Sequence, residues 1–450
     1  MLILADDMGH GHVSRLNPQA KFQTPHIDRL ASQGVTLTDA HSGSAVCSPT
    51  RYGLLTGRYA WRTKLVSGVL KPYDPPLIEA NRLTLPALLK QHGYHTACVG
   101  KWHLGWDWQL PQNGGEPDFR QPIAGGPTTR GFDHYFGTDV PNYPPYCYIE
   151  NDRTLGLPTA HKEQVRLEGR AGAMLPGWKF DAILPGLVER GERYIASRAA
   201  TREPFFLYMP LTSPHEPINP SAEFRGKSGL GALADFILET DAVVGRIAAA
   251  IERAGIADNT LFIFTADNGS STYAGGDELI RLGHAPSAKF RGFKASIYEG
   301  GHRVPFMARW PGQIAAGSTS TETICLTDML ATMAQVVGAK LPDDAGEDSY
   351  NVLGALRGES HSMPIREATV HQSAAGQLAI RQGRWKLIVP LGPERKPILD
   401  DPTQATLYDL EADPVEQHDR AAAEPEVVAR LTKLLDQYRR TGRSHPPREG

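Results

Sequence analysis

Short apolar runs alternate with amphipathic segments along most of the chain. The apolar runs predict β-strands at residues 2–5, 34–40, 94–100, 204–211, 260–265 and 306–310. Helical spacing, with a cap residue and a proline at some starts, predicts α-helices at residues 24–31, 52–58, 82–90, 187–198, 233–253 and 328–337. Apolar strands that alternate with helices are typical of an α/β fold around an open, parallel-type sheet.

The pattern changes twice along the chain. Residues 106–180 are rich in Pro, Gly, Trp and Tyr and show little periodicity, which predicts long loops of the kind that recognise substrates. Residues 139–148 could line a pocket there, or form packed irregular structure. Beyond residue 350 we expect a hairpin, a further strand and a charged helix. The prediction is therefore a catalytic domain at residues 1–350 and a small α+β subdomain at residues 351–450.

Composition narrows the functional classes. The chain has 450 residues, a formal net charge of −3 and 40% hydrophobic residues, so nothing in its charge calls for nucleic acid or an anionic membrane surface. No apolar run is long enough to predict a membrane span. The cysteines are scattered and form no C-x-x-C pair, which argues against a disulfide framework or a thiolate zinc site: Cys47, Cys98, Cys147 and Cys325.

The first residues read directly as a core strand, and no secretory leader is visible before them. Such a start is expected of a chain that was trimmed or whose beginning was assigned late. The missing leader therefore does not argue against export, and a periplasmic or extracellular location is our expectation.

One cysteine occupies a special position. Cys47 is followed by Pro49, which suits the first turn of a helix, and by Arg51 one turn further on. The unpaired N–H groups and the dipole of a helix N-terminus favour an anion at such a place, and Arg51 adds a permanent positive charge. This pattern predicts a nucleophile that handles an anion.

Oxygen ligands follow two of the predicted strands. Asp6 and Asp7 come directly after the first strand, and Asp267 and Asn268 follow the strand at residues 260–265. Ligands of open α/β sheets bind at the carboxyl ends of strands, and these four oxygens suit one hard cation such as Ca²⁺ or Mg²⁺. The alternatives are a polar turn or helix cap at the aspartate pair and a simple turn at the Asn-Gly pair.

Further candidates lie in loops that follow other strands. Lys101 and His103 follow directly after the strand at residues 94–100. Alternate side chains of an extended chain point to the same side, so these two are expected to lie on one side. His215 follows the strand at residues 204–211, and Lys294 lies in a basic, Gly-rich loop. A lysine can hold an oxyanion, and a histidine can move protons near neutral pH. Each could instead be an ordinary solvated loop residue.

Taken together, these segments resemble the type I sulfatases of the alkaline phosphatase superfamily, which include formylglycine-dependent arylsulfatases and N-acetylgalactosamine-6-sulfatases. The resemblance covers nearly the whole chain. Its most specific part is Cys47-x-Pro49-x-Arg51 with Leu54–Arg58, and three weaker matches support it, at residues 100–103, 267–269 and 298–301. It implies a large, mostly parallel sheet sandwiched by helices, with a smaller C-terminal subdomain of antiparallel sheet and helix.

The resemblance also implies a site. A maturation enzyme would oxidise Cys47 to Cα-formylglycine, which would complete a Ca²⁺ site (Mg²⁺ is possible) with the ligands Asp6, Asp7, Asp267 and Asn268. The implied sulfate-pocket residues are Arg51, Lys101, His103, His215 and Lys294. In the implied mechanism one hydroxyl of the aldehyde hydrate attacks sulfur, and we expect His215 to protonate the leaving alcohol. His103 then takes the proton of the second hydroxyl.

The expected function is hydrolysis of a sulfate monoester, from a sulfated carbohydrate or an aryl sulfate. Residues 53–62 and 100–106 are similar to bacterial arylsulfatases and N-acetylgalactosamine-6-sulfatases, which favours a 6-sulfated galactose or N-acetylgalactosamine. One alternative is a phosphonate monoester hydrolase or phosphodiesterase of the same superfamily. Another is a catalytically silent protein that binds sulfated glycans, if Cys47 is never oxidised. A single oxygen-rich site argues against a two-zinc phosphatase.

Overall fold

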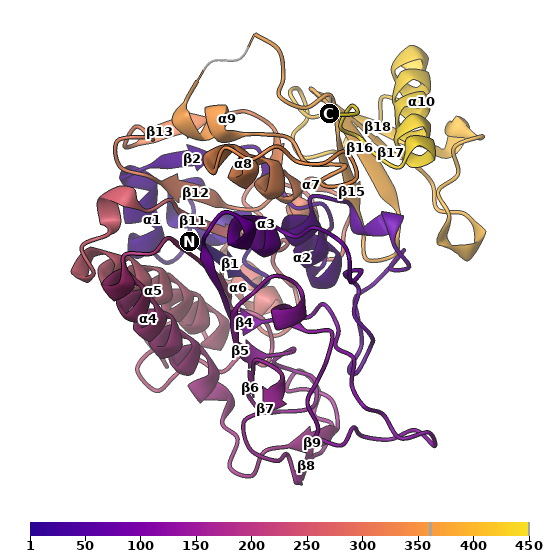
Figure 1. The fold of residues 1–450 in the computed structure, drawn as a ribbon. Helices are drawn as coiled ribbons and strands as arrows, with labels where there is room; N and C mark the ends of the chain where they lie inside the picture. The colour runs from indigo at the N-terminus through magenta and orange to yellow at the C-terminus, as the bar shows by residue number, and fades with distance from the viewer. Residues whose placement is uncertain (360–361, 449–450) are drawn as a thin grey trace.

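The computed structural model describes residues 1–359 and 362–448, and a large twisted sheet forms its centre (Figure 1). In spatial order the strands of this sheet are β13 (Ser318–Ser320), β2 (Val35–Leu37), β12 (Phe306–Arg309), β11 (Phe262–Ala266), β1 (Leu2–Ala5), β10 (Phe205–Pro210), β4 (His95–Lys101), β5 (His134–Thr138), β6 (Ile149–Glu150) and β7 (Arg153–Thr154). The central strands from β11 to β5 are parallel, whereas β12 and β6 pair antiparallel with their neighbours. The mostly parallel sheet predicted from the family resemblance is confirmed.

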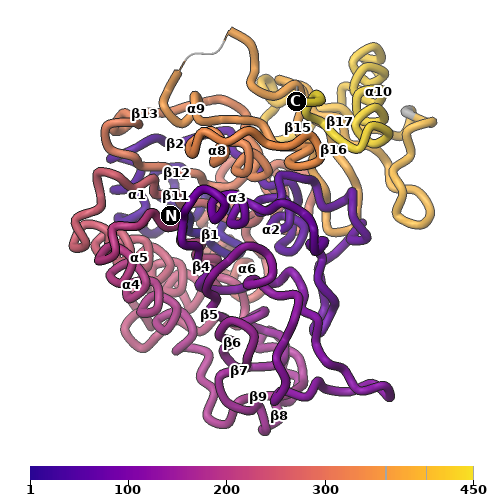
Figure 2. Tube along the Cα trace, in the orientation of Figure 1, coloured from indigo at the N-terminus to yellow at the C-terminus, as the bar shows by residue number. Residues whose placement is uncertain are grey.

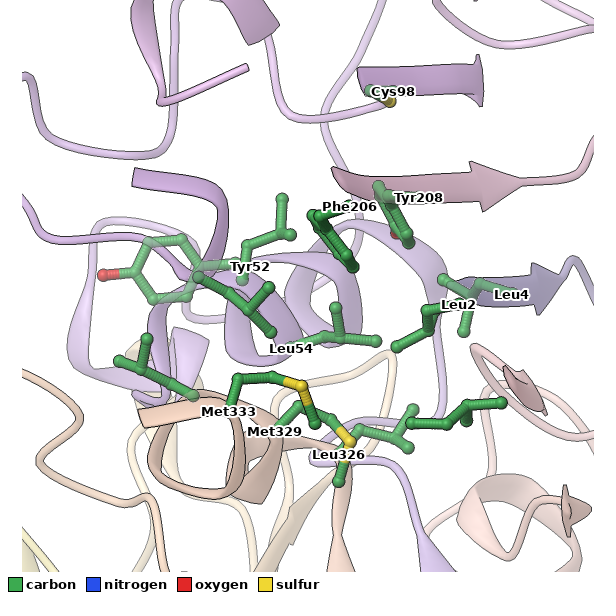
Figure 3. Packing of buried hydrophobic residues seen from close by; sticks show 14 of the residues in the cluster. Leu2, Leu4, Tyr52, Leu54, Cys98, Phe206, Tyr208, Leu326, Met329 and Met333 are labelled. Atoms are coloured by element: carbon green, nitrogen blue, oxygen red, sulfur yellow. The ribbon is translucent and has the colours of Figure 1, made fainter. Parts of the chain in front are cut away.

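Strand β1 shows how the sheet divides the core. Side chains of a strand point alternately to opposite faces, so Leu2 and Leu4 enter one apolar cluster while Ile3 and Ala5 enter the other. Figure 3 shows the first cluster, in which Leu54 and Met329 pack beneath β1. The helices of this face are α2 (Cys47–Thr56), α3 (Leu85–Gln91), α8 (Met329–Val336) and α9 (Leu353–Arg357). The other face is covered by α1 (Pro25–Ser32), α4 (Ile183–Thr201) and α5 (Ala232–Arg253).

Short elements join these layers. The remaining α-helices of this part are α6 (Gly276–Arg281) and α7 (Glu299–His302), and two small sheets pair β3 (Ala40–His41) with β14 (Ile324–Cys325) and β8 (Ala160–Lys162) with β9 (Gly172–Met174). The 3-10 helices are η1 (His10–His12), η2 (Ser14–Leu16), η3 (Ala60–Arg62), η4 (Pro127–Thr129), η5 (Phe180–Ala182), η6 (Ala257–Asn259), η7 (Leu326–Asp328), η8 (Pro393–Arg395) and η9 (Pro402–Gln404). No helix among the described residues is both long and apolar enough to cross a membrane.

The last quarter of the chain forms a separate antiparallel sheet. Its strands follow in sequence order as β15 (Thr369–Gln372), β16 (Leu378–Gln382), β17 (Trp385–Ile388) and β18 (Thr406–Asp409), and α10 (Pro425–Thr441) packs on β16 and β17. Figure 2 shows this sheet beside α2. Gln372 at the end of β15 bridges to Ser44, so the sheet lies against the loop that leads to Cys47. The small antiparallel sheet and its helix are confirmed, whereas a domain boundary at residue 350 stays a prediction.

Most predicted elements differ from the observed ones by a few residues at their ends, and two of these differences bear on the site. The helix expected at residues 52–58 begins at Cys47 and ends at Thr56, so Pro49 lies inside its first turn and Gly57 caps its end. The strand expected at residues 34–40 splits, because β3 leaves the large sheet to pair with β14. Thr84 caps helix α3, because its hydroxyl accepts a hydrogen bond from the Ala87 amide at 3.3 Å.

Candidate active site

The two acidic strand ends lie side by side. Strands β1 and β11 pair in parallel with Ala5 opposite Ala266, so the residues that follow them emerge together. The Asp7 amide donates to Asp267 Oδ1 at 3.1 Å, and Asn268 Nδ2 donates to Asp7 Oδ1 at 2.8 Å. All of these side chains are buried. The structure therefore brings together the four oxygen-bearing residues at one edge of the sheet.

Cys47 is the first residue of α2 and faces this cluster. Its Sγ lies 3.7 Å from Asp6 Oδ1. Burial raises the pKa of the Cys47 thiol to about 12, which outweighs the opposite effect of nearby Lys101 and Lys294. The unmodified side chain is therefore a neutral thiol near neutral pH, and it is a weak nucleophile.

Arg51 lies one helical turn beyond Cys47 and is fully buried. Its Nε and Nη2 donate to Asp267 Oδ2 at 3.1 and 2.8 Å, and its Nη1 donates to the Lys101 carbonyl at 3.1 Å. The planar guanidinium can satisfy these acceptors together, which an ammonium group cannot. Arg51 therefore ties α2 to the ends of β11 and β4.

Two lysines complete the charge pattern. Lys101 Nζ lies 2.7 Å from Asp6 Oδ2, and Lys294 Nζ lies 2.6 Å from Asp7 Oδ2. Burial alone would lower the pKa of each lysine, but the facing carboxylates raise both pKa values, that of Lys294 well above its usual range. The three buried carboxylates thus face three cations, the buried Lys101 and Arg51 and the partly exposed Lys294, and the site is close to neutral overall.

His103 does not lie on an extended strand as expected. Strand β4 ends at Lys101, and His103 has a left-handed backbone with φ of 54°. Its Nε2 lies 3.1 Å from the Leu70 carbonyl, which can only accept, so Nε2 carries the proton of the neutral ring. Nδ1 is buried without a partner among the described residues, and burial together with Lys101 holds the His103 pKa well below its usual range. Nδ1 is thus free to accept a proton.

His215 follows β10 and reaches the same cluster. Its Nδ1 lies 2.6 Å from the Glu216 carbonyl, and its Nε2 lies 3.9 Å from Asp7 Oδ2. The carbonyl again assigns the ring proton to Nδ1, so that Nε2 faces the site. Burial, with the charge of Lys294, lowers the His215 pKa to about 4.

The donor set fits a hard cation. Asp6, Asp7, Cys47 and His215 each offer a ligand atom, and these atoms lie within 4.8 Å of one another. Asn268 Oδ1 is buried and has no hydrogen-bond partner among the described residues. A buried amide oxygen without a partner is uncommon, and carboxylate and amide oxygens are the ligands that Ca²⁺ and Mg²⁺ prefer. These residues could therefore hold a metal ion.

A cleft of about 480 Å³ opens above these groups. Its lining includes Cys47, His103, His215 and Lys294. Further lining residues are Asn142, Tyr143, Arg166, Arg170 and Glu216. Asn142 and Tyr143 belong to the loop that was expected either to line a pocket or to pack. The sequence did not single out Glu216, whose one signal is its place beside His215 between two prolines. A cavity of about 520 Å³ near Met1 holds none of the predicted site residues.

The histidines of the first loop do not join the site. His12 Nδ1 lies 3.0 Å from His284 Nε2, and His12 Nε2 lies 2.8 Å from Ser270 Oγ. His10 packs edge-on against Phe290. These contacts hold the loop after Asp7 against residues 284–290, so both histidines have a structural explanation.

Known proteins are similar to this chain in sequence and in fold. A family profile described as Sulfatase matches residues 1–339, and one described as N-sulphoglucosamine sulphohydrolase, C-terminal, matches residues 291–441. An N-acetylgalactosamine-6-O-sulfatase of Bacteroides thetaiotaomicron is 35% identical over 96% of this chain and 91% of its own length. Human arylsulfatase A is 32% identical over 96% of this chain and 86% of its own. A solved structure from work on glycosaminoglycan metabolism by Bacteroides thetaiotaomicron has a TM-score of 0.86 and 33% identity, and covers 98% of both chains.

Proposed function

The chain belongs to the sulfatase family, and on that premise we propose that it hydrolyses the sulfate ester of a sulfated carbohydrate through a residue made from Cys47. The observation that carries the proposal is the convergence of Cys47, three carboxylates, three cations and two histidines at one cleft. Such a site is suited to an anionic ester, because fixed positive charges can face its oxygens while histidines move protons.

Cys47 is the proposed precursor of the nucleophile. We propose that a maturation enzyme converts it to Cα-formylglycine, and the Cys47-x-Pro49-x-Arg51 pattern supports this. The thiol itself is neutral, since burial raises its pKa to about 12, and a thiolate would be repelled by a sulfate monoester. A residue modified in this way would offer two hydroxyls on one carbon as its hydrate, one to form a bond to sulfur and one whose deprotonation would expel the sulfate.

Asp6, Asp7, Asp267 and Asn268 are the proposed ligands of one Ca²⁺ ion, with Mg²⁺ as the alternative. The oxygen-rich donor set and the unpartnered Asn268 Oδ1 support this choice. Such an ion, when bound, lowers the pKa of a coordinated hydroxyl and offsets the charge of the carboxylates.

The cations have two different tasks. Lys101 and Lys294 place ammonium groups beside Cys47, where they can hold the sulfate oxygens. Arg51 is a positioning residue, because its guanidinium is bonded to Asp267 and to the Lys101 carbonyl. It holds the Asp267 carboxylate and the backbone of Lys101 at fixed positions relative to α2.

The histidines are the proposed proton carriers. His103 Nδ1 has no partner among the described residues and can take a proton from the second hydroxyl. His215 Nε2 is the proposed donor to the leaving alcohol. Its low pKa in the free enzyme leaves Nε2 without a proton, but a bound sulfate ester is negative, and a negative charge nearby raises the pKa of a histidine.

The proposed substrate is a sugar with a 6-sulfate, such as 6-sulfated galactose or N-acetylgalactosamine. The relative from Bacteroides thetaiotaomicron is named an N-acetylgalactosamine-6-O-sulfatase and matches nearly the whole chain, which supports this choice. The cleft volume of about 480 Å³ lies in the range of small-molecule sites and is large enough for a sugar ring.

The test combines mass spectrometry with kinetics. The chain is made in a host that produces formylglycine, and the peptide containing Cys47 is analysed for the modification. kcat/KM is then measured on an aryl sulfate, an aryl phosphate, a phosphonate monoester and a panel of defined sulfated sugars. We expect the modified residue and the highest kcat/KM on a 6-sulfated galactose-type sugar. An unmodified thiol without turnover favours a glycan-binding protein, and preference for the phosphonate ester favours the hydrolase alternative.

The metal is tested separately, by its effect on folding. Chelation with excess EDTA, followed by dialysis, should lower the thermal unfolding midpoint, because buried carboxylates lose their divalent partner. Addition of Ca²⁺ should restore the midpoint at lower concentration than Mg²⁺. The variant Asn268→Ala should weaken Ca²⁺ binding at least tenfold in a calorimetric titration, and equal binding by the two proteins would refute the ligand assignment.

A further inference from the structure

His103 has a backbone conformation that a residue with a Cβ atom rarely adopts. Strand β4 ends at Lys101, and two residues later His103 has φ of 54°. A left-handed backbone costs free energy for residues other than glycine, and it persists only where surrounding contacts enforce it. Because the His103 ring has a task in the proposed reaction, the groups that hold this turn bear on the chemistry.

The neighbouring strand β5 supplies two of those groups. Lys101 pairs with Thr138, the last residue of β5, and the Thr138 carbonyl accepts from the Trp102 amide at 3.1 Å. Asp139 comes next, and its Oδ1 accepts from the His103 amide at 3.2 Å. The first acceptor is a backbone carbonyl, which any residue at position 138 would provide. The second is a side chain, so it depends on the residue at position 139.

Asp139 is itself fixed in the core of the protein. Its Oδ1 also accepts from Trp106 Nε1 at 3.1 Å, and both residues are buried. Burial raises the pKa of the Asp139 carboxyl to about 6. Keeping a carboxyl group in the core costs free energy, which its two hydrogen bonds offset. Asp139 is not part of the cleft lining, so it can influence the reaction only through a neighbour such as His103.

The same turn sets the position of the His103 ring. The ring donates from Nε2 to the Leu70 carbonyl at 3.1 Å, and it contacts the Tyr143 ring edge-on with centroids 5.7 Å apart. Nδ1 is buried and has no partner among the described residues, and His103 lines the cleft that contains Cys47. A change of φ to the ordinary negative range would redirect the Cα–Cβ bond and take the ring out of this place.

We propose that Asp139 is a positioning residue for His103: its carboxylate holds the left-handed turn and so keeps the His103 ring at the cleft. The inference rests on the proposed function, in which His103 takes a proton after the alcohol has left. Asp139 touches neither the substrate nor the groups that release the alcohol. It therefore affects the second half of the reaction, and it acts through His103 alone.

The chain offers a matched control for Asp139. Asp133 lies just before β5, and its Oδ2 accepts from the Thr96 amide of β4 at 2.9 Å. Asp133→Ala thus removes the same kind of hydrogen bond as Asp139→Ala, at the opposite end of the same pair of strands. Both variants should lower the urea unfolding midpoint, because each leaves backbone donors without their acceptor. Only Asp139→Ala should alter the reaction.

The kinetic test uses the mature enzyme and 4-nitrophenyl sulfate, whose alcohol leaves readily, so that the later step limits kcat. Asp139→Ala should lower kcat about tenfold, which corresponds to one lost hydrogen bond, and should lower KM in proportion. kcat/KM should stay within about twofold, because it reports the steps up to the departure of the alcohol. Asp139→Asn keeps an acceptor oxygen and should restore kcat. A fall in kcat at unchanged KM, or an equal effect of Asp133→Ala, overturns the proposal.

A second measurement needs no turnover and separates this inference from the proposed function. The unmodified protein is labelled with ¹⁵N-histidine, and His103→Gln identifies the His103 ring signal by NMR. The Nε2–H of His103 should exchange with water about tenfold faster in Asp139→Ala, and at the original rate in Asp139→Asn and Asp133→Ala. Equal exchange in Asp139→Ala overturns the proposal.

If Asp139→Ala does not fold, Asp139→Ser takes its place in both measurements, because its hydroxyl is too short to reach both donors. Faster exchange in a protein whose mature form hydrolyses no sulfate ester would retain the positioning role and reject the proposed reaction.

Discussion

The neighbours of Cys47 carry matched charges, most of which are buried. Asp6, Asp7 and Asp267 face Lys101, Lys294 and Arg51 at hydrogen-bond distance. Removing one partner of a buried pair leaves an uncompensated charge, which costs about 3–5 kcal/mol in other proteins. Single substitutions here are therefore expected to affect folding as well as chemistry, and the two effects must be measured separately.

Cys47→Ala is expected to separate them. The thiol is neutral, and its one side-chain hydrogen bond within the described part of the chain, to Asp6 at 3.7 Å, is weak, so its loss costs little stability. Turnover of an aryl sulfate should fall at least about 10³-fold, because the nucleophile is gone. Circular dichroism and the thermal unfolding midpoint should match those of the unmutated protein. Retained turnover by the purified variant would refute the nucleophile assignment.

Arg51→Lys keeps the charge but should still damage the site. One ammonium group cannot replace three N–H donors that reach Asp267 and the Lys101 carbonyl. We expect the free energy of unfolding to fall by about 1–3 kcal/mol and kcat to fall more than tenfold. Urea denaturation and aryl sulfate hydrolysis measure the two effects. Arg246→Lys, at an exposed pair with Glu192, is the control and should change neither.

At the scale of elements, helix α2 depends on how it ends. It stops at Gly57, which has φ of +64°, and the Gly57 amide bonds back to the Gly53 carbonyl at 2.8 Å. A Cβ at this position would lie 2.8 Å from Ser349 Cβ and 2.9 Å from Gly346 Cα. The end of the helix that carries Cys47 and Arg51 is therefore packed tightly against residues 346–349, where only glycine fits.

Gly57→Ala should therefore lower the free energy of unfolding by more than the backbone strain of a left-handed cap residue alone. Gly442 caps α10 with φ of +74°, but a Cβ there would meet nothing within 4 Å. Gly442→Ala should lower the free energy of unfolding by about 1 kcal/mol, from backbone strain. Gly57→Ala adds a clash and should lower it by about 2–4 kcal/mol. Urea unfolding of both variants checks this, and equal losses would show that packing at Gly57 is unimportant.

At the scale of the whole molecule, a buried polar network joins the two sheets. Its histidines are His41, His302 and His371, and its charged groups are Asp39, Glu299, Glu416, Arg303, Arg381 and Lys386. The histidine nitrogens lie within 4.8 Å of one another. However, Lys386 Nζ and Arg381 Nη1 each lie 3.0 Å from a ring nitrogen, which opposes a bound cation. We therefore interpret the network as a structural connection between the two sheets, and this connection is called the joint below.

This joint should be sensitive to acid. Burial holds the pKa values of His41, His302 and His371 below the ordinary 6.5, those of the latter two well below it. Below pH 6.5 the unfolded chain binds protons that these folded rings reject, so stability is complete above that pH and is lost as pH falls. For each ring that stays neutral in the folded protein, the free energy of unfolding should fall by about 1.4 kcal/mol as the pH is lowered from 7.5 to 5.5.

The pH dependence is tested with one histidine at a time. In His371→Gln, urea unfolding at pH 7.5 and 5.5 should show a loss of stability on acidification that is smaller by about 1.4 kcal/mol. The control His161→Gln changes an exposed histidine of β8 and should leave the loss unchanged. An unaltered loss in His371→Gln would mean that this ring does not contribute to acid sensitivity.

The sequence alone determined much of this protein. Apolar runs such as residues 2–5 and 260–265 specify buried strands, and their polar ends specify where ligands collect, because both signals are local. The Cys47-x-Pro49-x-Arg51 pattern is local as well. The sequence predicted the ends of helices and strands less accurately. Helix α2 begins at Cys47, and the strand predicted at residues 34–40 splits because β3 pairs with β14.

Only the tertiary structure decided which groups meet. The register of β1 against β11 places Asp7 beside Asp267 across 260 positions of sequence, and the fold brings Lys294 to Asp7. That Asn142 Oδ1 and Glu216 Oε2 have no hydrogen-bond partner among the residues the structure describes was invisible in the sequence, because it is a property of packing. Residue types and local pattern thus determined the chemistry that the chain can offer. Long-range pairing decided which atoms share one cleft, since contacts between distant segments leave no periodic signal in a single sequence.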